Sequence, residues 1–77
     1  MNKARRKKLE EIVNALDAQR SAIEGVCEEE QEAFDNLPES IQYSERGETM
    51  EGHISEMEDA ISNLEDIISS LQEIIDA

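Results

Sequence analysis

Paired cysteines, aromatic residues and long apolar runs are all missing from this 77-residue sequence, which has one Cys, one Phe, one Tyr and no Trp. A single cysteine cannot form a disulfide within the chain. A core of this size rarely supplies more than about 3–5 kcal/mol by itself. We therefore expect self-association to stabilise the fold. The lone Cys27 also fits a reducing compartment.

No stretch approaches the roughly 18 apolar residues that a membrane-spanning helix needs. The basic start, Met1–Lys8, is not followed by the apolar core of a signal peptide. We expect a soluble, cytoplasmic protein without a membrane partner.

Basic residues are scarce: seven oppose 20 acids, for a formal charge of −13. Five of the seven precede Leu9, and only Arg20 and Arg46 follow it. Such acidity argues against direct nucleic-acid binding and favours a basic protein partner, including one that normally binds nucleic acid. High charge alone would suggest disorder, but a regular apolar repeat argues against it.

The repeat is clearest in the last third of the chain, where three apolar columns recur every seven residues. They correspond to positions a, d and e of one helix. In order, the columns are Met50, Met57, Leu64 and Leu71; His53, Ala60, Ile67 and Ile74; and Ile54, Ile61, Ile68 and Ile75. A stripe this wide predicts packing against two neighbours, as in a bundle. Leu9, Leu16 and Ile23 begin the same pattern in the first half, which Gln19 and Glu30 interrupt.

Pro38 separates the two apolar patterns and cannot continue the first helix. It is acceptable in a first helical turn, so residues 38–43 can form a short turn of their own. Ser44 is a candidate N-cap for the second helix. The sequence predicts one all-α domain over residues 1–77, with a helix over 3–35, a turn over 36–44 and a helix over 45–76.

The two helices are expected to form an antiparallel, coiled-coil-like hairpin that dimerises into a four-helix bundle. A turn centred between residues 41 and 42 matches Leu9 with Ile74 and Glu30 with His53. The e column is then left for self-association. Its residues are Val13, Ile54, Ile61, Ile68 and Ile75.

The stretch from Glu28 to Ser40, with Ser44–Glu48 and the Lys/Arg-rich start, resembles a family of small acidic helical proteins. These proteins are encoded by phages, prophages and mobile elements of Gram-positive bacteria. The resemblance covers most of the chain, and only the turn is distinctive. It implies a setting in the bacterial host cell, and it implies no functional residue.

Catalysis has no support in the sequence, because no nucleophile has a recognisable base beside it. His53, Glu56 and Glu30 could meet at one level of the hairpin, but one His in a reversed motif argues against a metal site. We expect His53 to pair with Glu30 and to make stability depend on pH between about 5 and 7. No metal and no cofactor is predicted, and Cys27 is expected to be a buried free thiol.

The acidic surface remains as the candidate binding site. Its proposed residues are Glu28, Glu29, Glu32, Asp35, Glu45, Glu48, Glu51, Glu58, Asp59, Glu65 and Asp66. The leading interpretation is a non-catalytic, phage-like interaction protein, whose sharper form is an anti-defence inhibitor that mimics nucleic acid. The alternatives are an assembly subunit of a phage or mobile-element complex and a DNA-associated protein using its basic N-terminus. Acids that serve only solubility remain a further possibility.

Overall fold

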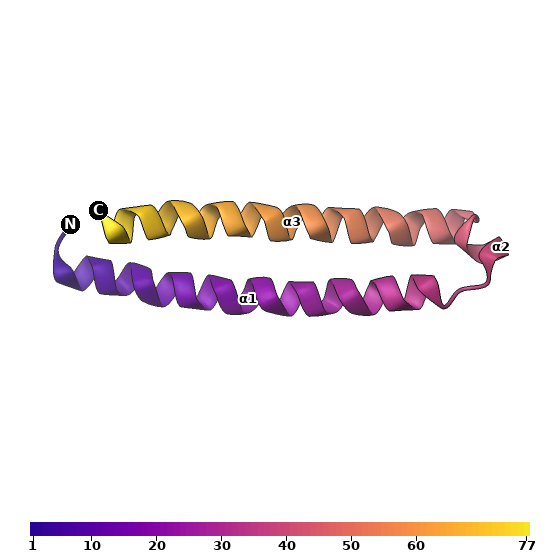
Figure 1. Ribbon diagram of the computed structural model, residues 1–77, viewed down its shortest axis with the longest axis horizontal. Coiled ribbons are helices and arrows are strands. Elements are labelled where there is room, and N and C mark those ends of the chain that lie inside the picture. The colour runs from indigo at the N-terminus through magenta and orange to yellow at the C-terminus, as the bar shows by residue number, and fades with distance from the viewer.

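A computed structural model of residues 1–77 shows a slender helical hairpin, with Cα extents of 58 × 15 × 12 Å (Figure 1). Helix α1 spans Lys3–Asp35, the single turn α2 spans Glu39–Gln42, and α3 spans Glu45–Asp76. The long helices run antiparallel, so both chain ends lie at one end, the open end, and α2 lies at the other, the tip. The helices have the bounds that the sequence predicts. None of the three combines the length and apolar composition that a bilayer-spanning segment needs.

Local chemistry explains where the helices begin and end. The Asn2 side chain accepts a hydrogen bond from the Arg5 amide at 2.9 Å and caps α1. Ser44 caps α3 by accepting from the Gly47 amide at 3.5 Å, as predicted. Pro38 is the N-cap of α2, consistent with the predicted short turn. The Gln42 side chain donates to the Phe34 carbonyl at 3.0 Å and so joins the Leu37 amide, which donates to the same oxygen at 3.0 Å, at the end of α1.

The core is a single seam between α1 and α3. Its α3 members follow one another at alternating intervals of three and four residues, the spacing of a coiled coil. On α3 they are Gly47, Met50, Ile54, Met57, Ile61, Leu64, Ile68, Leu71 and Ile75. The matching α1 positions are Arg6, Leu9, Val13, Leu16, Arg20, Ile23, Cys27, Glu30 and Phe34. The α3 side of the seam is therefore wholly uncharged, and the charged members all come from α1.

The composition of this seam corrects the predicted one. Ile75 is 6% exposed whereas Ile74 is 44% exposed, so Ile75 rather than Ile74 packs against α1. The hairpin thus uses the a and e columns and leaves the d column outside. The physical reason is apolar volume: on α3 the e column offers four Ile residues, whereas the d column includes His53 and Ala60.

At the tip, the chain passes so close to α3 that only glycine fits at position 47. A Cβ on Gly47 would meet the backbone of Gln42 and would lie 2.6 Å from the Ile41 carbonyl oxygen. Leu37 and Ile41 are half-buried at the tip, where they close that end of the core. Tyr43, in contrast, is 79% exposed.

Candidate protein-binding surfaces

The hairpin has two broad faces of opposite character, one on each side of the seam. A hollow on one side is lined only by apolar side chains: Ala22, Ile23, Val26, Met57 and Ala60. A hollow on the other side is lined mainly by polar ones: Gln31, Phe34, Glu51, Ile54, Ser55 and Glu58. We call these sides the apolar face and the acidic face. Because seven residues return a helix to nearly the same direction, each face can be followed along the hairpin from these anchors.

The apolar face is the outward column that the seam does not use. Stepping by seven from Val26 and Ala60 leads to Ile12, Ile67 and Ile74. These large side chains are unusually open: Ile12 is 48% exposed, Val26 54% and Ile67 50%. Ala15, Ala22 and Ala33 continue the face on α1. Soluble monomers rarely leave so many large apolar side chains exposed along one side, so this face is a candidate interaction surface.

The predicted self-association residues are not on this face. Val13, Ile54 and Ile75 are buried within the hairpin, and Ile61 and Ile68 are half-buried in the same seam. That assignment is therefore wrong for the three buried residues, whose side chains are already covered by the same chain. The sequence signal for the exposed apolar column was its composition: the d column is smaller and more polar, so it makes a poorer seam and is left outside.

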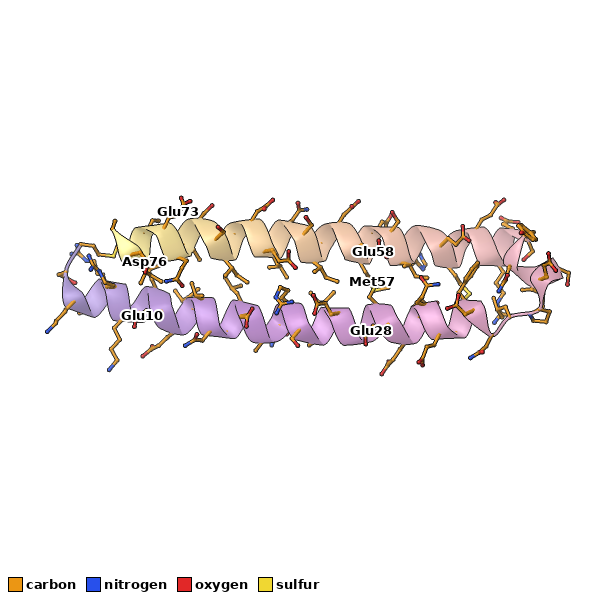
Figure 2. The ribbon with its side chains drawn as sticks, in the orientation of Figure 1. Glu10, Glu28, Met57, Glu58, Glu73 and Asp76 are labelled. Carbon is orange, nitrogen blue, oxygen red and sulfur yellow. The ribbon has the colours of Figure 1, made fainter.

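The acidic face combines residues from both long helices. Figure 2 shows Glu28 and Glu58 at the same level on α1 and α3, with Met57 between the helices. Steps of seven from the hollow and from Glu28 extend the face along both helices. Its carboxylates are Glu10, Asp17, Glu24, Glu28, Asp35, Glu48, Glu51, Glu58, Glu65 and Asp76. All of these except Glu24, which is half-buried, are exposed.

All eleven predicted partner-binding acids are exposed, but they do not form one surface. Those on the acidic face are Glu28, Asp35, Glu48, Glu51, Glu58 and Glu65. The outward sides of the helices hold Glu32, Glu45, Asp59 and Asp66, and Glu29 lies at the edge of the apolar face. Sequence reasoning missed Glu10, Asp17 and Glu24, although their seven-residue spacing from Gln31 signals a shared side.

Arg20 is the one cation that pairs with acids of this face. Its guanidinium lies 2.7 Å from a Glu24 oxygen and 3.1 Å from an Asp17 oxygen. The hydrogen bonds that Arg20 donates to Asp17 and then to Glu24 raise the pKa of Arg20, which therefore stays charged. The pairing offsets acidity near the middle of α1 and leaves the tip half of the acidic face uncompensated.

His53 does not form the predicted pair with Glu30. Both residues line a hollow on the apolar side together with Glu56, but His53 is exposed and makes no hydrogen bond or ion pair. No group of His, Cys, Asp and Glu side chains has the geometry to hold a metal ion. The predicted pH dependence through this pair therefore loses its structural basis.

Cys27 is a free, buried thiol whose Sγ donates toward the Ile54 carbonyl oxygen at 3.9 Å. Burial raises the pKa of Cys27, and the carboxylates of Glu58 and Glu28 add to the effect. A protonated thiol in this position is a poor nucleophile.

The basic residues of the N-terminus divide between the two faces. Lys3, Arg6 and Lys7 surround a hollow with Glu10, which places them on the acidic side. Arg5 and Lys8 lie one repeat before Ile12 and Ala15, which places them on the apolar side.

Comparison with other proteins adds no assignment. No protein-family model, curated protein or solved structure matches this chain.

Proposed function

We propose that this chain is a non-catalytic interaction protein with two working surfaces. Its apolar face pairs two copies into a four-helix bundle, and its acidic face binds a basic protein. The resemblance of the turn to small phage and prophage proteins gives the setting. There, the basic partner is a host defence or nucleic-acid-binding protein that the acidic face inhibits.

The observation behind this proposal is the separation of apolar and acidic side chains onto opposite sides of one seam. Stacking two hairpins through their apolar faces removes Ile12, Val26 and Ile67 from water. The same stacking turns the two acidic faces outward on opposite sides of the bundle. Dimerisation through the apolar faces thus covers the apolar side chains and leaves both acidic faces accessible to a partner.

The spacing of charges on the acidic face shows how closely this face can imitate DNA. Ten carboxylates along a 58 Å body amount to one per about 6 Å, against one per about 1.7 Å of duplex DNA. The face therefore attracts a basic groove by its long-range field rather than by copying phosphate geometry. Binding of this kind weakens steeply as salt rises.

The test compares two variants of equal charge. One replaces acids on the acidic face, with Glu28→Gln, Glu51→Gln, Glu58→Gln and Glu65→Gln. Its matched control neutralises four acids on the outward sides, with Glu32→Gln, Glu45→Gln, Asp59→Asn and Asp66→Asn. Each immobilised protein is exposed to lysate of a Gram-positive bacterium, and bound proteins are eluted by a salt gradient and identified.

The expected result is a basic, nucleic-acid-binding protein that the wild type and the control retain and that the first variant loses. Added duplex DNA should displace this protein, because both ligands then use the same basic groove. Equal retention by the two variants would contradict a specific acidic face, and so would binding that persists at about 1 M salt.

A further inference from the structure

We propose that the two copies in the bundle stack head to tail, so that the open end of each hairpin covers the tip half of the other. The inference rests on the proposed dimer and adds its orientation. The occupant of the apolar face is thus a second copy of this chain. One broad side of a body 58 Å by 15 Å offers about 800 Å² per copy, the area of a standard protein interface.

Charge is the first reason for this orientation. Residues 28–58, at the tip half, contain eleven acids opposed only by Arg46, whereas residues 1–8 contain five of the seven basic residues. Tips placed side by side would bring two strongly acidic ends together. Head-to-tail stacking instead places each basic start over an acidic half, which lowers the repulsion of the pair.

The apolar face itself carries this complementarity. Arg5 and Lys8 lie on it at the open end, and Glu29, Glu30 and Glu56 lie on it in the tip half. Lys8 and Glu30 are each eleven residues from Gln19, or about 16 Å along the helix. A two-fold axis at Gln19 therefore brings Lys8 of each copy to the level of the partner copy's acids, and the contact occurs twice.

The side chain of Gln19 is suited to a position on the two-fold axis. It is an exposed polar residue in the otherwise apolar column of Ile12 and Val26. On the axis it meets its own copy, and an amide can both donate to and accept from an identical amide. A single polar pair inside an apolar interface fixes register and orientation in helical assemblies.

The face also tapers in side-chain size. Ile12, Ile67 and Ile74 occupy the open end, whereas Ala33 and Ala60 occupy the tip half. About the same axis α1 stacks on α1 of the partner copy and α3 on α3, so Ile12 of one copy faces Val26 of the other. The bulkier open end of each face then lies over the tip half of the other, where the side chains are smaller, as close packing requires. Tips side by side would place Ile over Ile at one end and leave gaps at the other.

Spin labels on the tip measure the orientation directly. Tyr43→Cys in a Cys27→Ala background puts a label at an exposed tip position, and Ser21→Cys in the same background puts one near the middle. Pulsed electron paramagnetic resonance then gives the distance between the two copies. Head-to-tail stacking predicts a tip distance above about 50 Å and a middle distance of about 20–30 Å.

Each other outcome has a definite meaning. Tip labels closer than about 30 Å, with the middle distance unchanged, would overturn the orientation and leave the dimer intact. The absence of any inter-copy distance at the middle position would overturn the proposed dimer as well. Circular dichroism of both labelled variants establishes that the hairpin still forms.

A charge exchange tests the contact. Arg5→Glu with Lys8→Glu should raise the dimer dissociation constant about tenfold or more, and adding Glu29→Lys with Glu56→Lys should restore most of the affinity. The matched control is Lys3→Glu with Lys7→Glu, which makes the same change in net charge on the acidic side. Equal weakening by both pairs, measured by analytical ultracentrifugation, would contradict the contact.

Discussion

At the scale of single residues, the three glycines lie in two kinds of environment, which predict opposite effects of replacing glycine by alanine. Nothing lies within 4 Å of a Cβ built on Gly25 or on Gly52. Alanine at either position should raise the free energy of unfolding by about 1 kcal/mol, through helix propensity alone. Alanine at Gly47 should lower it by about 1–3 kcal/mol, since the methyl group would overlap the backbone at the tip. Urea unfolding of the three variants measures all these changes. A stabilising Gly47→Ala would contradict the close approach.

The Cys27 thiol predicts a dependence of stability on alkaline pH. Because its pKa is raised in the folded state, folding keeps a proton that the unfolded chain releases above about 8.5. The stabilising effect is therefore complete below that pH and is lost as pH rises toward the folded pKa. The thermal midpoint of the wild type should fall more between pH 8 and 10 than that of Cys27→Ala. The native thiol should also react with a disulfide reagent much more slowly than the thiol of the unfolded chain.

At the scale of helices, the sequence determines where each element begins and ends. Pro38 and Ser44 identify the turn and the start of α3 without any tertiary information. The choice of seam is harder, because three apolar columns permit two seams with coiled-coil spacing. The decision depends on the summed volume of facing side chains across both helices. Local spacing does not reveal this summed volume. The seam on α3 therefore lies one residue away from its predicted position, at Ile75 instead of Ile74.

The same ambiguity explains which parts of the surfaces could be predicted. The exposure of the acids follows from composition, since so many charges cannot be buried in a two-helix core. Which face each acid lies on depends on the direction of the seam. Glu58 can therefore be assigned to the acidic face, and Glu29 to the edge of the apolar face, only after the seam residues are known. The apolar face was predicted to exist but was assigned to the wrong column for this reason.

A matched pair of Ile substitutions on α3 distinguishes the seam from the apolar face. Ile54 is 6% exposed and Ile67 is 50% exposed. Ile54→Ala should cost about 2–4 kcal/mol and lower the thermal midpoint at every protein concentration. Ile67→Ala should lower it mainly at concentrations where the proposed dimer forms, because in that dimer only the second copy covers its side chain. Equal effects of both substitutions at nanomolar concentration would contradict the seam.

At the scale of the whole molecule, net charge acts against compactness. A charge of −13 on two thin helices produces self-repulsion that salt screens. Raising sodium chloride from about 20 mM to 500 mM should raise the thermal midpoint of the hairpin and tighten the dimer. A variant in which Glu32, Glu45, Asp59 and Asp66 are all neutralised should respond less. A midpoint that falls with salt would show instead that attractive ion pairs dominate.

The placement of both chain ends at one end of the hairpin has a mechanical consequence (Figure 1). A force that pulls residues 1 and 77 apart loads the seam layer that contains Ile75 first, and the next layer bears the load only after this one has parted. The helices should therefore unzip at low force, in steps from the open end toward Gly47. If the same hairpin were pulled along its length, from the tip and from one chain end, every layer of the seam would have to shear at once. Unfolding should then need a much higher force.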